Sequence, residues 1–325
     1  MNILMCSVGR RGELIKNFRR SMSKGGKIVA TDFSPYAPAL YFADKQYLVP
    51  RIDDLSYIDI LLDICVKESI NAITTFIDPE IEILAVNREK FETLGVEVLA
   101  PYKETAKLCF NKYLMYEHLR KYKIPTVMTW GTIEEFDRAY KNGKITFPVF
   151  IKPRTGSGSV GIRKVFEYDV LVESMKKDSS LIIQEFMDCI DLDADVYIDT
   201  ISHEAVSVFS KKKLETRIGG ASKTVSFKDE KLFSFISNIV KTLKFNGPVD
   251  MDFFYKDGQY YLSEINPRFG GAYLHAYGAG VDFIKLIERN IRGESNKPEF
   301  GKYDEDITMM MYDSVVIKRK CELTK

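Results

Sequence analysis

The sequence feature that most constrains this chain is the stretch at residues 249–271, VDMDFFYKDGQYYLSEINPRFGG. Two apolar runs, at residues 249–255 and 260–265, flank the turn Lys256-Asp257-Gly258. A short turn of this composition between two apolar runs is typical of a β-hairpin. The stretch therefore predicts two antiparallel strands that contribute to a buried sheet.

Carboxylates interrupt both predicted strands. Asp252 lies in the first strand and Glu264 near the end of the second, where a buried carboxylate without a partner costs several kcal/mol. Asn266 lies two residues past Glu264 and therefore faces the same side of an extended strand. Two carboxylates and an amide oxygen are ligands suited to Mg²⁺, with Arg268 as a fixed cation nearby. The alternative is an ordinary cross-strand polar pair on a solvated sheet face.

A glycine-rich loop precedes the hairpin by about a hundred residues. The apolar strand at residues 147–153 contains Lys152 near its end, and a loop follows directly. Backbone N–H groups of such a loop can surround phosphate oxygens, and the lysine supplies a point charge. No G-K-[ST] closes the loop, so it is not a Walker A motif. The predicted phosphate-binding loop residues are Gly156, Ser157, Gly158, Ser159, Val160 and Gly161.

The hairpin ending, with Asp252 and Glu264-x-Asn266-Pro-Arg268, resembles the magnesium-binding end of the ATP-grasp superfamily. Together with the loop at this distance, it makes the chain similar to short single-copy proteins related to the carbamoyl-phosphate synthase large subunit. The resemblance implies an α/β ATP-grasp fold, in which a doubly wound parallel sheet domain precedes two α+β lobes. The implied divisions are an N-terminal domain at 1–100, a small lobe with a glycine-rich lid at 101–185, and a large lobe with the metal site and a short tail at 186–325.

The N-terminal pattern agrees with a parallel sheet. Strand-like runs at residues 2–6, 27–31, 72–76 and 96–99 alternate with helical patterns at 13–22, 57–68 and 79–91. Such alternation predicts βαβ units in a doubly wound sheet. A nicotinamide-binding domain is the rival interpretation, with Asp32 contacting a ribose. The first turn, however, has glycines only at Gly9 and Gly12, so the dinucleotide fingerprint is not met.

Several nucleotide-binding roles are implied by the resemblance. Lys112, at the head of a helix at 111–122 with Asn111 as its cap, would contact phosphates, although a lone lysine there is commonly a surface residue. The strand at 181–187 would form the hinge that meets adenine, or else an ordinary edge strand. The implied hinge residues are Gln184, Glu185, Phe186 and Met187, and Asp191 would bind the ribose.

Candidate substrate residues are less sharply defined. Arg217 is either a clamp for a γ-phosphate or substrate carboxylate, or a surface arginine. Asp78 either faces a substrate or caps the helix that begins at Pro79, and His275 either touches the acceptor or is a hydrogen-bonded structural histidine. The full candidate set is Arg10, Arg11, Asp78, Glu80 and His275, with Arg268 and Arg217 as catalytic cations. The Lys211-Lys212-Lys213 run is interpreted as a solvated charge run.

Composition restricts the partners. Lys plus Arg (47) nearly balances Asp plus Glu (46), so no global field favours nucleic acid or an anionic membrane. The five cysteines are scattered, and neither a signal peptide nor a membrane span is predicted, so we expect a cytoplasmic protein with reduced thiols. The tail is expected to return to the body through strands at 307–312 and 315–317. A homodimer is possible.

The resemblance implies an ATP-dependent carboxylate–amine ligase that acts through an acyl phosphate with Mg²⁺, or Mn²⁺, and releases ADP and phosphate. The partners would be a small-molecule carboxylate and an amine, both unidentified. The alternatives are a non-catalytic or regulatory ATP-binding protein, a phosphotransferase on the same scaffold, and carbamoyl-phosphate synthesis. That last reaction uses two ATP-grasp copies and a glutaminase in the family, whereas this chain has one copy.

Overall fold

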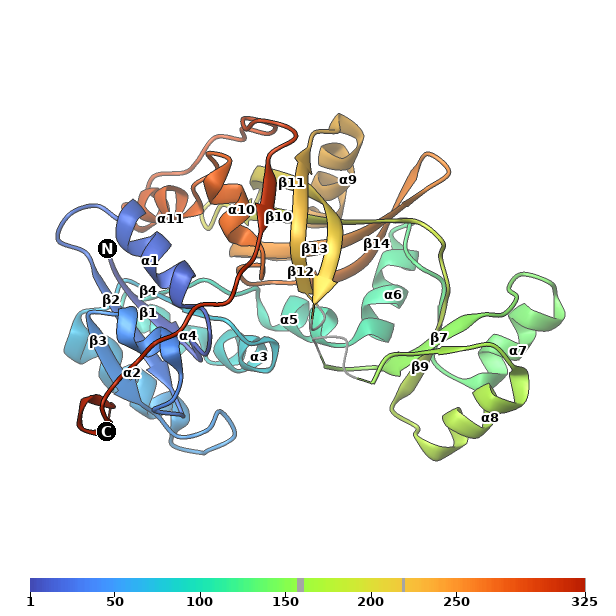
Figure 1. Cartoon of the computed structure of the whole chain (residues 1–325), viewed down its shortest axis with the longest axis horizontal. Coiled ribbons are helices and arrows are strands. Elements are labelled where there is room, and N and C mark those ends of the chain that lie inside the picture. The colour runs from blue at the N-terminus through green and yellow to red at the C-terminus, as the bar shows by residue number, and fades with distance from the viewer. Residues whose placement is uncertain (157–160, 218–219, 325) are drawn as a thin grey trace.

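The computed structural model describes residues 1–156, 161–217 and 220–324, and three β-sheets organise them (Figure 1). The predictions for Ser157, Gly158, Ser159 and Val160 therefore lie outside the described residues. In the described ranges, no helix combines the length and the apolar character that crossing a bilayer requires.

The N-terminal sheet has five parallel strands in the order β3-β2-β1-β4-β5, which confirms the doubly wound prediction. Alternate residues of β1 pack into two separate cores, Ile3 and Met5 in one and Leu4 and Cys6 in the other, because helices cover both faces. The strands are β1 (Asn2–Cys6), β2 (Lys27–Asp32), β3 (Lys45–Leu48), β4 (Ala72–Thr75) and β5 (Glu97–Val98). The helices are α1 (Gly12–Ser21), the 3₁₀ helix η1 (Pro38–Phe42), α2 (Tyr57–Glu68), α3 (Asp78–Val86) and α4 (Arg88–Thr93).

One predicted helix of this domain is divided in the structure. The pattern at residues 79–91 becomes α3 and α4, with Asn87 between them. The Asn87 side chain donates a hydrogen bond to the Ile83 carbonyl at 2.9 Å, an interaction that competes with continued helix. Strand β3 was not predicted, because its four residues are half exposed and carry little periodicity.

The small lobe holds a four-stranded antiparallel sheet in the order β6-β9-β7-β8. Figure 1 shows this lobe standing out from the rest of the molecule. Its own core includes Trp130, Phe136, Ile151 and Leu171. The elements are β6 (Thr129–Trp130), α7 (Ile133–Lys141), β7 (Val149–Pro153), β8 (Arg163–Val165), α8 (Tyr168–Lys177) and β9 (Leu181–Glu185). Because β9 pairs with strands on both sides, the edge-strand interpretation of the hinge is wrong.

The large lobe is built on a six-stranded antiparallel sheet in the order β14-β13-β10-β11-β12-β15. The predicted hairpin is confirmed as β13 and β14, and Asp257 and Gly258 both adopt positive φ (50° and 81°), as a type I′ turn requires. The strands are β10 (Ile190–Ile198), β11 (Ala205–Arg217), β12 (Gly220–Phe227), β13 (Gly247–Lys256), β14 (Gln259–Asn266) and β15 (Thr308–Met310). The helices are α9 (Glu230–Val240), α10 (Tyr273–Gly278) and α11 (Phe283–Ile291).

Two helices join the N-terminal domain to the lobes, α5 (Lys103–Phe110) and α6 (Lys112–Lys121). Helix α5 contacts α3 of the N-terminal domain and β14 of the large lobe. The small-lobe sheet itself begins only at Thr129. The division at residue 101 thus remains a prediction, and these two helices lie where all three parts approach one another.

The C-terminal tail differs from expectation. Strand β15 pairs with β12, but residues 315–317 form no strand, and Val315 and Ile317 are more than four-fifths exposed. The tail instead crosses the N-terminal domain, past the loop at Pro35 to the 3₁₀ helix η2 (Lys320–Glu322), as Figure 1 shows in red. Thr324 donates a hydrogen bond to Gln46 at 2.7 Å. The tail thereby connects the six-stranded sheet of the large lobe with the five-stranded N-terminal sheet.

Candidate active site

The hairpin presents a row of polar side chains on one face. Asp252 lies directly opposite Glu264, and Asp250 lies opposite Asn266. Directly opposed residues, and residues two apart on one strand, share a face of an antiparallel sheet. The predicted metal-binding set of Asp252, Glu264 and Asn266 therefore shares one face, joined by Asp250, which the sequence reasoning missed.

The neighbouring strand β10 extends this face. Asp193 is opposite Asp252 and Asp195 is opposite Asp250, while Asp191 occupies the preceding position on the same side. The predicted ribose residue is thus the end of a three-aspartate row. Aspartates at every second residue of 191–195 indicate a strand with one acidic face. Only the pairing of β10 with β13 shows that this face continues the polar face of the hairpin.

Two lysines of β11 complete the face, and here the prediction of a solvated charge run is wrong. Lys211 has no exposed surface, contacts Asp193 at 3.2 Å and donates to Asp195. Lys213 contacts Asp191 at 2.9 Å and also pairs with Asp252. Lys212 points the other way and is exposed, as the two-residue period of a strand requires.

Burial controls the charge state of this face. Loss of water raises the pKa of Asp193 and Asp252 to about 6 and that of Asp250 to about 7. Burial alone would lower the pKa of Lys211 and Lys213, but the surrounding aspartates outweigh it and raise both. At neutral pH the two lysines therefore remain charged and offset the carboxylates of this face.

The predicted metal set has the donor chemistry of a hard-cation site. Glu264 Oε1 lies 3.3 Å from Lys112 Nζ, and Asn266 Nδ2 lies 3.5 Å from Asp252 Oδ2. The ammonium of Lys112 compensates Glu264 and that of Lys213 compensates Asp252, which is the role a divalent cation would take. The described residues include no group of three or more His, Cys, Asp or Glu side chains placed to hold a metal, so the set of two carboxylates and an amide stays a prediction.

Lys112 lies at the head of α6, which Asn111 caps by accepting hydrogen bonds from two backbone N–H groups. Its ammonium donates to the Gly156 carbonyl as well as meeting Glu264, and only 12% of its side chain is exposed. The surface-lysine alternative is therefore wrong. Gly156 has φ +108°, a conformation that side-chain-bearing residues rarely adopt, so glycine is required where the loop leaves β7.

Lys152 projects from β7 and is buried at 6% exposure. Its pKa falls to about 8 because burial disfavours the ammonium form; Glu264 opposes this shift and Lys112 adds to it. The ammonium form of Lys152 is therefore less favoured in the free protein than that of an exposed lysine.

This low pKa predicts a pH dependence of nucleotide binding. MgADP affinity is expected to fall about fivefold between pH 8 and pH 9, because phosphates prefer the protonated lysine. Calorimetric titration across this range measures the effect. Lys152→Met is expected to remove the slope and the exposed-site variant Lys141→Met to keep it; an unchanged slope in Lys152→Met would contradict the assignment.

The predicted hinge lies where β9 ends. Gln184 donates to Thr129 Oγ1 at 3.0 Å. The Glu185 N–H donates to the Met128 carbonyl at 2.9 Å, and the Glu185 carboxylate accepts from the Met128 N–H at 3.3 Å. The Phe186 ring packs on Phe150 with centroids 5.6 Å apart.

The sequence reasoning missed one hinge neighbour. Lys164 Nζ lies 3.4 Å from the centroid of the Phe186 ring. No motif singled this lysine out, because its place beside the hinge depends on the pairing of β8 with β7. Beyond the ring, the Met187 carbonyl accepts a hydrogen bond from Cys189 Sγ at 3.3 Å.

Arg268 connects the hairpin to the N-terminal domain. Its Nε donates to Asp78 Oδ1 at 2.8 Å and its Nη1 to Asp250 Oδ2 at 3.4 Å. Burial alone would lower the pKa of Arg268, but the charges of Asp78 and Asp250 outweigh the effect of burial and raise that pKa. Asp78 is the first residue of α3 and makes no side-chain cap, so the capping interpretation is wrong.

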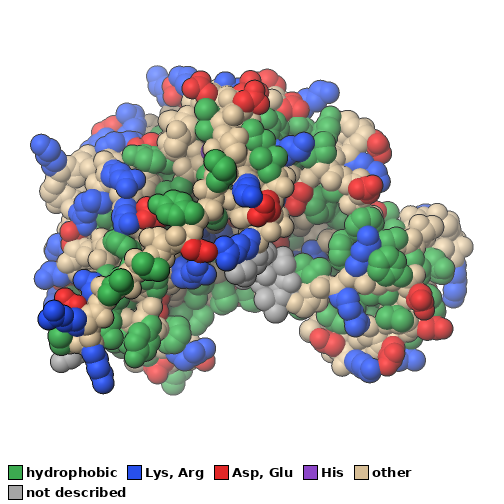
Figure 2. Space-filling view, in the orientation of Figure 1, with side chains coloured by type: hydrophobic (Ala, Val, Ile, Leu, Met, Phe, Trp, Pro, Cys, Tyr) green, Lys and Arg blue, Asp and Glu red, His purple; other side chains and the backbone are tan. Residues whose placement is uncertain are grey.

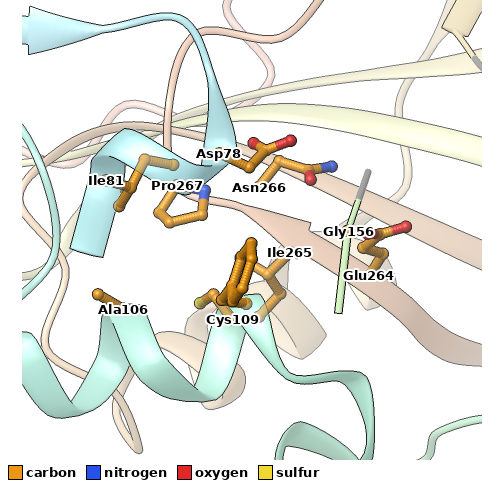
Figure 3. Close-up of a pocket in the computed structure, with 10 residues that line it drawn as sticks. Asp78, Ile81, Ala106, Cys109, Gly156, Glu264, Ile265, Asn266 and Pro267 are labelled. Atoms are coloured by element: carbon orange, nitrogen blue, oxygen red, sulfur yellow. The ribbon is translucent and has the colours of Figure 1, made fainter. Parts of the chain in front are cut away.

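Figure 3 shows Asp78, Asn266, Glu264 and Gly156 around one small pocket, with Cys109 of α5 below them. The pocket thus joins the N-terminal domain, the hairpin and the phosphate loop. All three are parts of the predicted site.

Arg11 lies beside this arrangement and donates to the Gly270 carbonyl at 3.0 Å. Burial, helped by the charge of Arg268, lowers its pKa to about 10. A Cβ at Gly270 would lie 2.6 Å from Asp195 Oδ1 and 2.7 Å from Asp250 Oδ1, which explains why glycine occupies this position.

Two candidate substrate residues are inside the protein. Glu80 has no exposed surface and accepts hydrogen bonds from Tyr57 and, at 2.6 Å, Thr75. His275 is 2% exposed and bonds to Thr224 Oγ1 at 2.7 Å and to a backbone carbonyl at 2.9 Å. The structural interpretation of His275 is therefore preferred, and neither residue is kept as a substrate contact.

Arg10 and Arg217 have exposed side chains and approach the same tail carboxylate. Arg10 Nη2 lies 3.4 Å from Asp313 Oδ1, and Arg217 Nη1 lies 3.0 Å from Asp313 Oδ2. The exposed side chain of Arg217 agrees with the surface-arginine alternative, and its role as a clamp for a phosphate or a substrate stays a prediction. This ion pair between Arg217 and Asp313 involves no residue of the hairpin.

Comparisons with known proteins agree with this geometry. Residues 3–99 match the PylC-like N-terminal domain family, and residues 109–272 match the ATP-grasp domain family. A pyruvate carboxylase component from Methanothermobacter thermautotrophicus is 23% identical over 88% of this chain, which spans 64% of that protein's length. Phosphoribosylamine–glycine ligase of Fusobacterium nucleatum is 24% identical over 83% of this chain and 68% of its own length.

The carbamoyl-phosphate synthase large chain, C-terminal section, of Methanocaldococcus jannaschii is 22% identical over 66% of this chain and 37% of that protein. Among solved structures, N5-carboxyaminoimidazole synthetase from Staphylococcus aureus, complexed with ADP, superposes with a TM-score of 0.74. Its sequence identity is 19%, and the match covers 92% of this chain and 79% of that one. The predicted resemblance and the predicted fold are both confirmed.

Proposed function

Since this chain belongs to the ATP-grasp family, we propose that it is an ATP-dependent carboxylate–amine ligase that releases ADP and phosphate. The observation that carries the proposal is one charged sheet face, Asp252 to Arg268, that lies against Lys112 and Gly156. Positive groups from one lobe and carboxylates from the other meet there, which is the arrangement needed to hold a metal-bound triphosphate.

We assign roles to the chain's own residues from their positions. Lys112, Lys152 and the backbone at Gly156 bind phosphate oxygens. Asp252, Glu264 and Asn266 would hold Mg²⁺, or Mn²⁺, which supplies charge neutralisation at the phosphates. The segment 184–187 accommodates adenine, with Asp191 near the ribose. Arg268 stabilises the negative charge that develops on the transferred phosphoryl group.

The proposed reaction has two steps. A substrate carboxylate oxygen forms a bond to the γ-phosphorus of ATP while the bond to ADP breaks, which gives an acyl phosphate. An amine nitrogen then bonds to the acyl carbon, inorganic phosphate leaves, and the amine loses a proton to solvent. Exclusion of water during the first step protects the acyl phosphate from hydrolysis.

The test is ADP and phosphate release with Mg²⁺ and ATP across paired mixtures of small carboxylic acids and amines. We expect release that depends on a substrate pair and falls about 10²–10³-fold in Glu264→Gln, which keeps the side-chain shape but removes a charge at the phosphates. Glu215→Gln, at an exposed ion pair with Lys223, is the matched control and is expected to keep full activity.

Other outcomes would favour the alternatives. Tight MgADP binding without turnover, unchanged in Glu264→Gln, would indicate a non-catalytic ATP-binding protein. ADP release with one acceptor alone, giving a stable phosphate ester, would indicate a phosphotransferase. A homodimer, a cytoplasmic location and small-molecule partners remain predictions of the same proposal.

A further inference from the structure

The N-terminal domain carries a second pocket, of about 540 Å³, at the carboxyl ends of its parallel strands. The loops that follow β1, β2, β3 and β4 line it, and in doubly wound sheets this edge is where ligands bind. Its volume is sufficient for a small molecule. Of the described residues that were candidates for the ligase site, only Arg10 lies in its wall.

The floor of this pocket is polar and firmly held. Asp32 is 6% exposed, and its two carboxylate oxygens accept hydrogen bonds from the N–H groups of Gly9 at 2.9 Å and Ser34 at 3.0 Å. Tyr57 lines the pocket and donates its hydroxyl to the fully buried Glu80. Glu80 therefore acts as support beneath the pocket, which accounts for a buried carboxylate that the ligase site does not use.

The rim combines exposed aromatic rings with cations. Phe33 is 59% exposed and Tyr36 is 77% exposed, although both are large rings in the pocket wall. The Arg51 guanidinium carbon lies 5.2 Å from the Phe33 centroid, and its nearest acid, Asp53, is 3.8 Å away. Rings and a loosely paired arginine suit a ligand with a flat or apolar body and an anionic group.

Arg10, which also lines the pocket, already meets a carboxylate. Asp313 of the tail lies 3.4 Å from its guanidinium, and four-fifths of the arginine side chain is exposed. The contact is long and solvated, so it is weak and exchangeable. Figure 2 shows Lys and Arg side chains scattered over the exposed surface of the molecule, and the exposed Arg10 can receive an anion from solution as well as from the chain itself.

This pocket adjoins the proposed reaction centre through α3. Ile77 and Pro79 line the pocket, while Asp78, between them, lines the small pocket beside Glu264 and Asn266 and bonds to Arg268. The residues on either side of Asp78 in the sequence thus line the larger pocket, while Asp78 itself lines the small one. This shared segment at the start of α3 is the reason to assign the larger pocket to the substrate of the proposed reaction.

We propose that the pocket is the substrate-specificity subsite, and that it binds a small molecule with a flat apolar body and a second anionic group, carboxylate or phosphate, between Arg10 and Arg51. This inference rests on the proposed ligase function, because it assigns the subsite to the same substrate. Phe33 and Tyr36 contact the body of the ligand, and Asp313 competes with its anionic group for Arg10.

Calorimetric titration of the full chain with four probes tests the proposal. Phenyl phosphate and phenylacetate carry both features, benzyl alcohol lacks the charge, and inorganic phosphate lacks the ring. We expect at least one ring-bearing anion to bind about tenfold or more tightly than the two half-probes, and the better of the pair identifies the anionic group. Arg51→Gln is expected to weaken its binding about tenfold and Asp313→Asn to strengthen it a few-fold.

Matched controls separate this inference from the ligase proposal. Arg120→Gln removes an arginine that lies over Tyr116 outside the pocket, and it is expected to leave probe binding unchanged. MgADP affinity, measured in parallel, is expected to be the same in Arg51→Gln as in the parent protein. Normal MgADP binding without any preference for ring-bearing anions, or a preference that Arg51→Gln leaves intact, would overturn the subsite and leave the ligase proposal standing.

Discussion

Replacement of Lys211 by methionine is expected to lower the free energy of unfolding by about 3–5 kcal/mol. Lys211 has no exposed surface, and its ammonium lies between Asp193 and Asp195, which are themselves buried. Methionine matches the length of the side chain but leaves two carboxylates in the protein interior without the ammonium that pairs with both. Urea unfolding of the two proteins at neutral pH, monitored by circular dichroism, measures the difference.

The adjacent Lys212 supplies the control. It is exposed on the opposite side of the same strand, so Lys212→Met is expected to change stability by no more than about 0.5 kcal/mol. A loss in Lys211→Met of under about 1 kcal/mol would contradict the buried ion-pair network.

The pH dependence gives a second check on the same variant. Burial already raises the pKa of Asp193 to about 6, and removal of the lysine takes away the charge that holds it down. The folded variant then binds more protons than its unfolded chain, so its deficit should shrink as the pH falls from 8 towards 5.

The sequence predicted the parts of this molecule that local chemistry specifies. Asp257 and Gly258 between two apolar runs require a hairpin whatever surrounds them, and the two-residue period then puts Asp252, Glu264 and Asn266 on one face. The β1 strand and α2 were likewise predicted with the observed bounds, because buried alternation and amphipathic spacing are local properties.

The parts that failed depend on pairing between distant segments. Lys211 has the pattern of a charge run until β11 lies beside β10 and sets it opposite Asp193. Glu80 and His275 have the residue types of a catalytic site, but Tyr57 and Thr224, far away in sequence, determine that they are buried structural groups. Residues 315–317 have strand-like composition but meet no free strand edge among the described residues, so they stay extended and exposed.

Arg268 illustrates how the site is assembled across domains. Its Nε reaches Asp78 of the N-terminal domain and its Nη1 reaches Asp250 of the large lobe. A guanidinium can make both contacts and still present a planar donor edge, whereas an ammonium is a single compact charge. The position therefore requires arginine if it both joins the two parts and stabilises the transferred phosphoryl group.

Arg268→Lys is accordingly expected to reduce kcat of the proposed ligase about 10²–10³-fold, with little change in the KM for MgATP. Steady-state ADP release with saturating substrates measures this effect. Arg289→Lys, at an exposed ion pair with Glu294, is the matched control and is expected to keep its activity.

Because Arg268 is buried, a loss of folding has to be separated from a loss of catalysis. Normal MgADP binding and an unchanged urea midpoint in Arg268→Lys would show that the protein is intact. Asp78→Asn keeps the arginine charge but weakens its hold, so it should lower kcat by a smaller factor, about tenfold. If Arg268→Lys turned over at the parental rate, Arg268 would be a structural link between the domains, and the charge on the phosphoryl group would have to be stabilised by Lys112 and Lys152 alone.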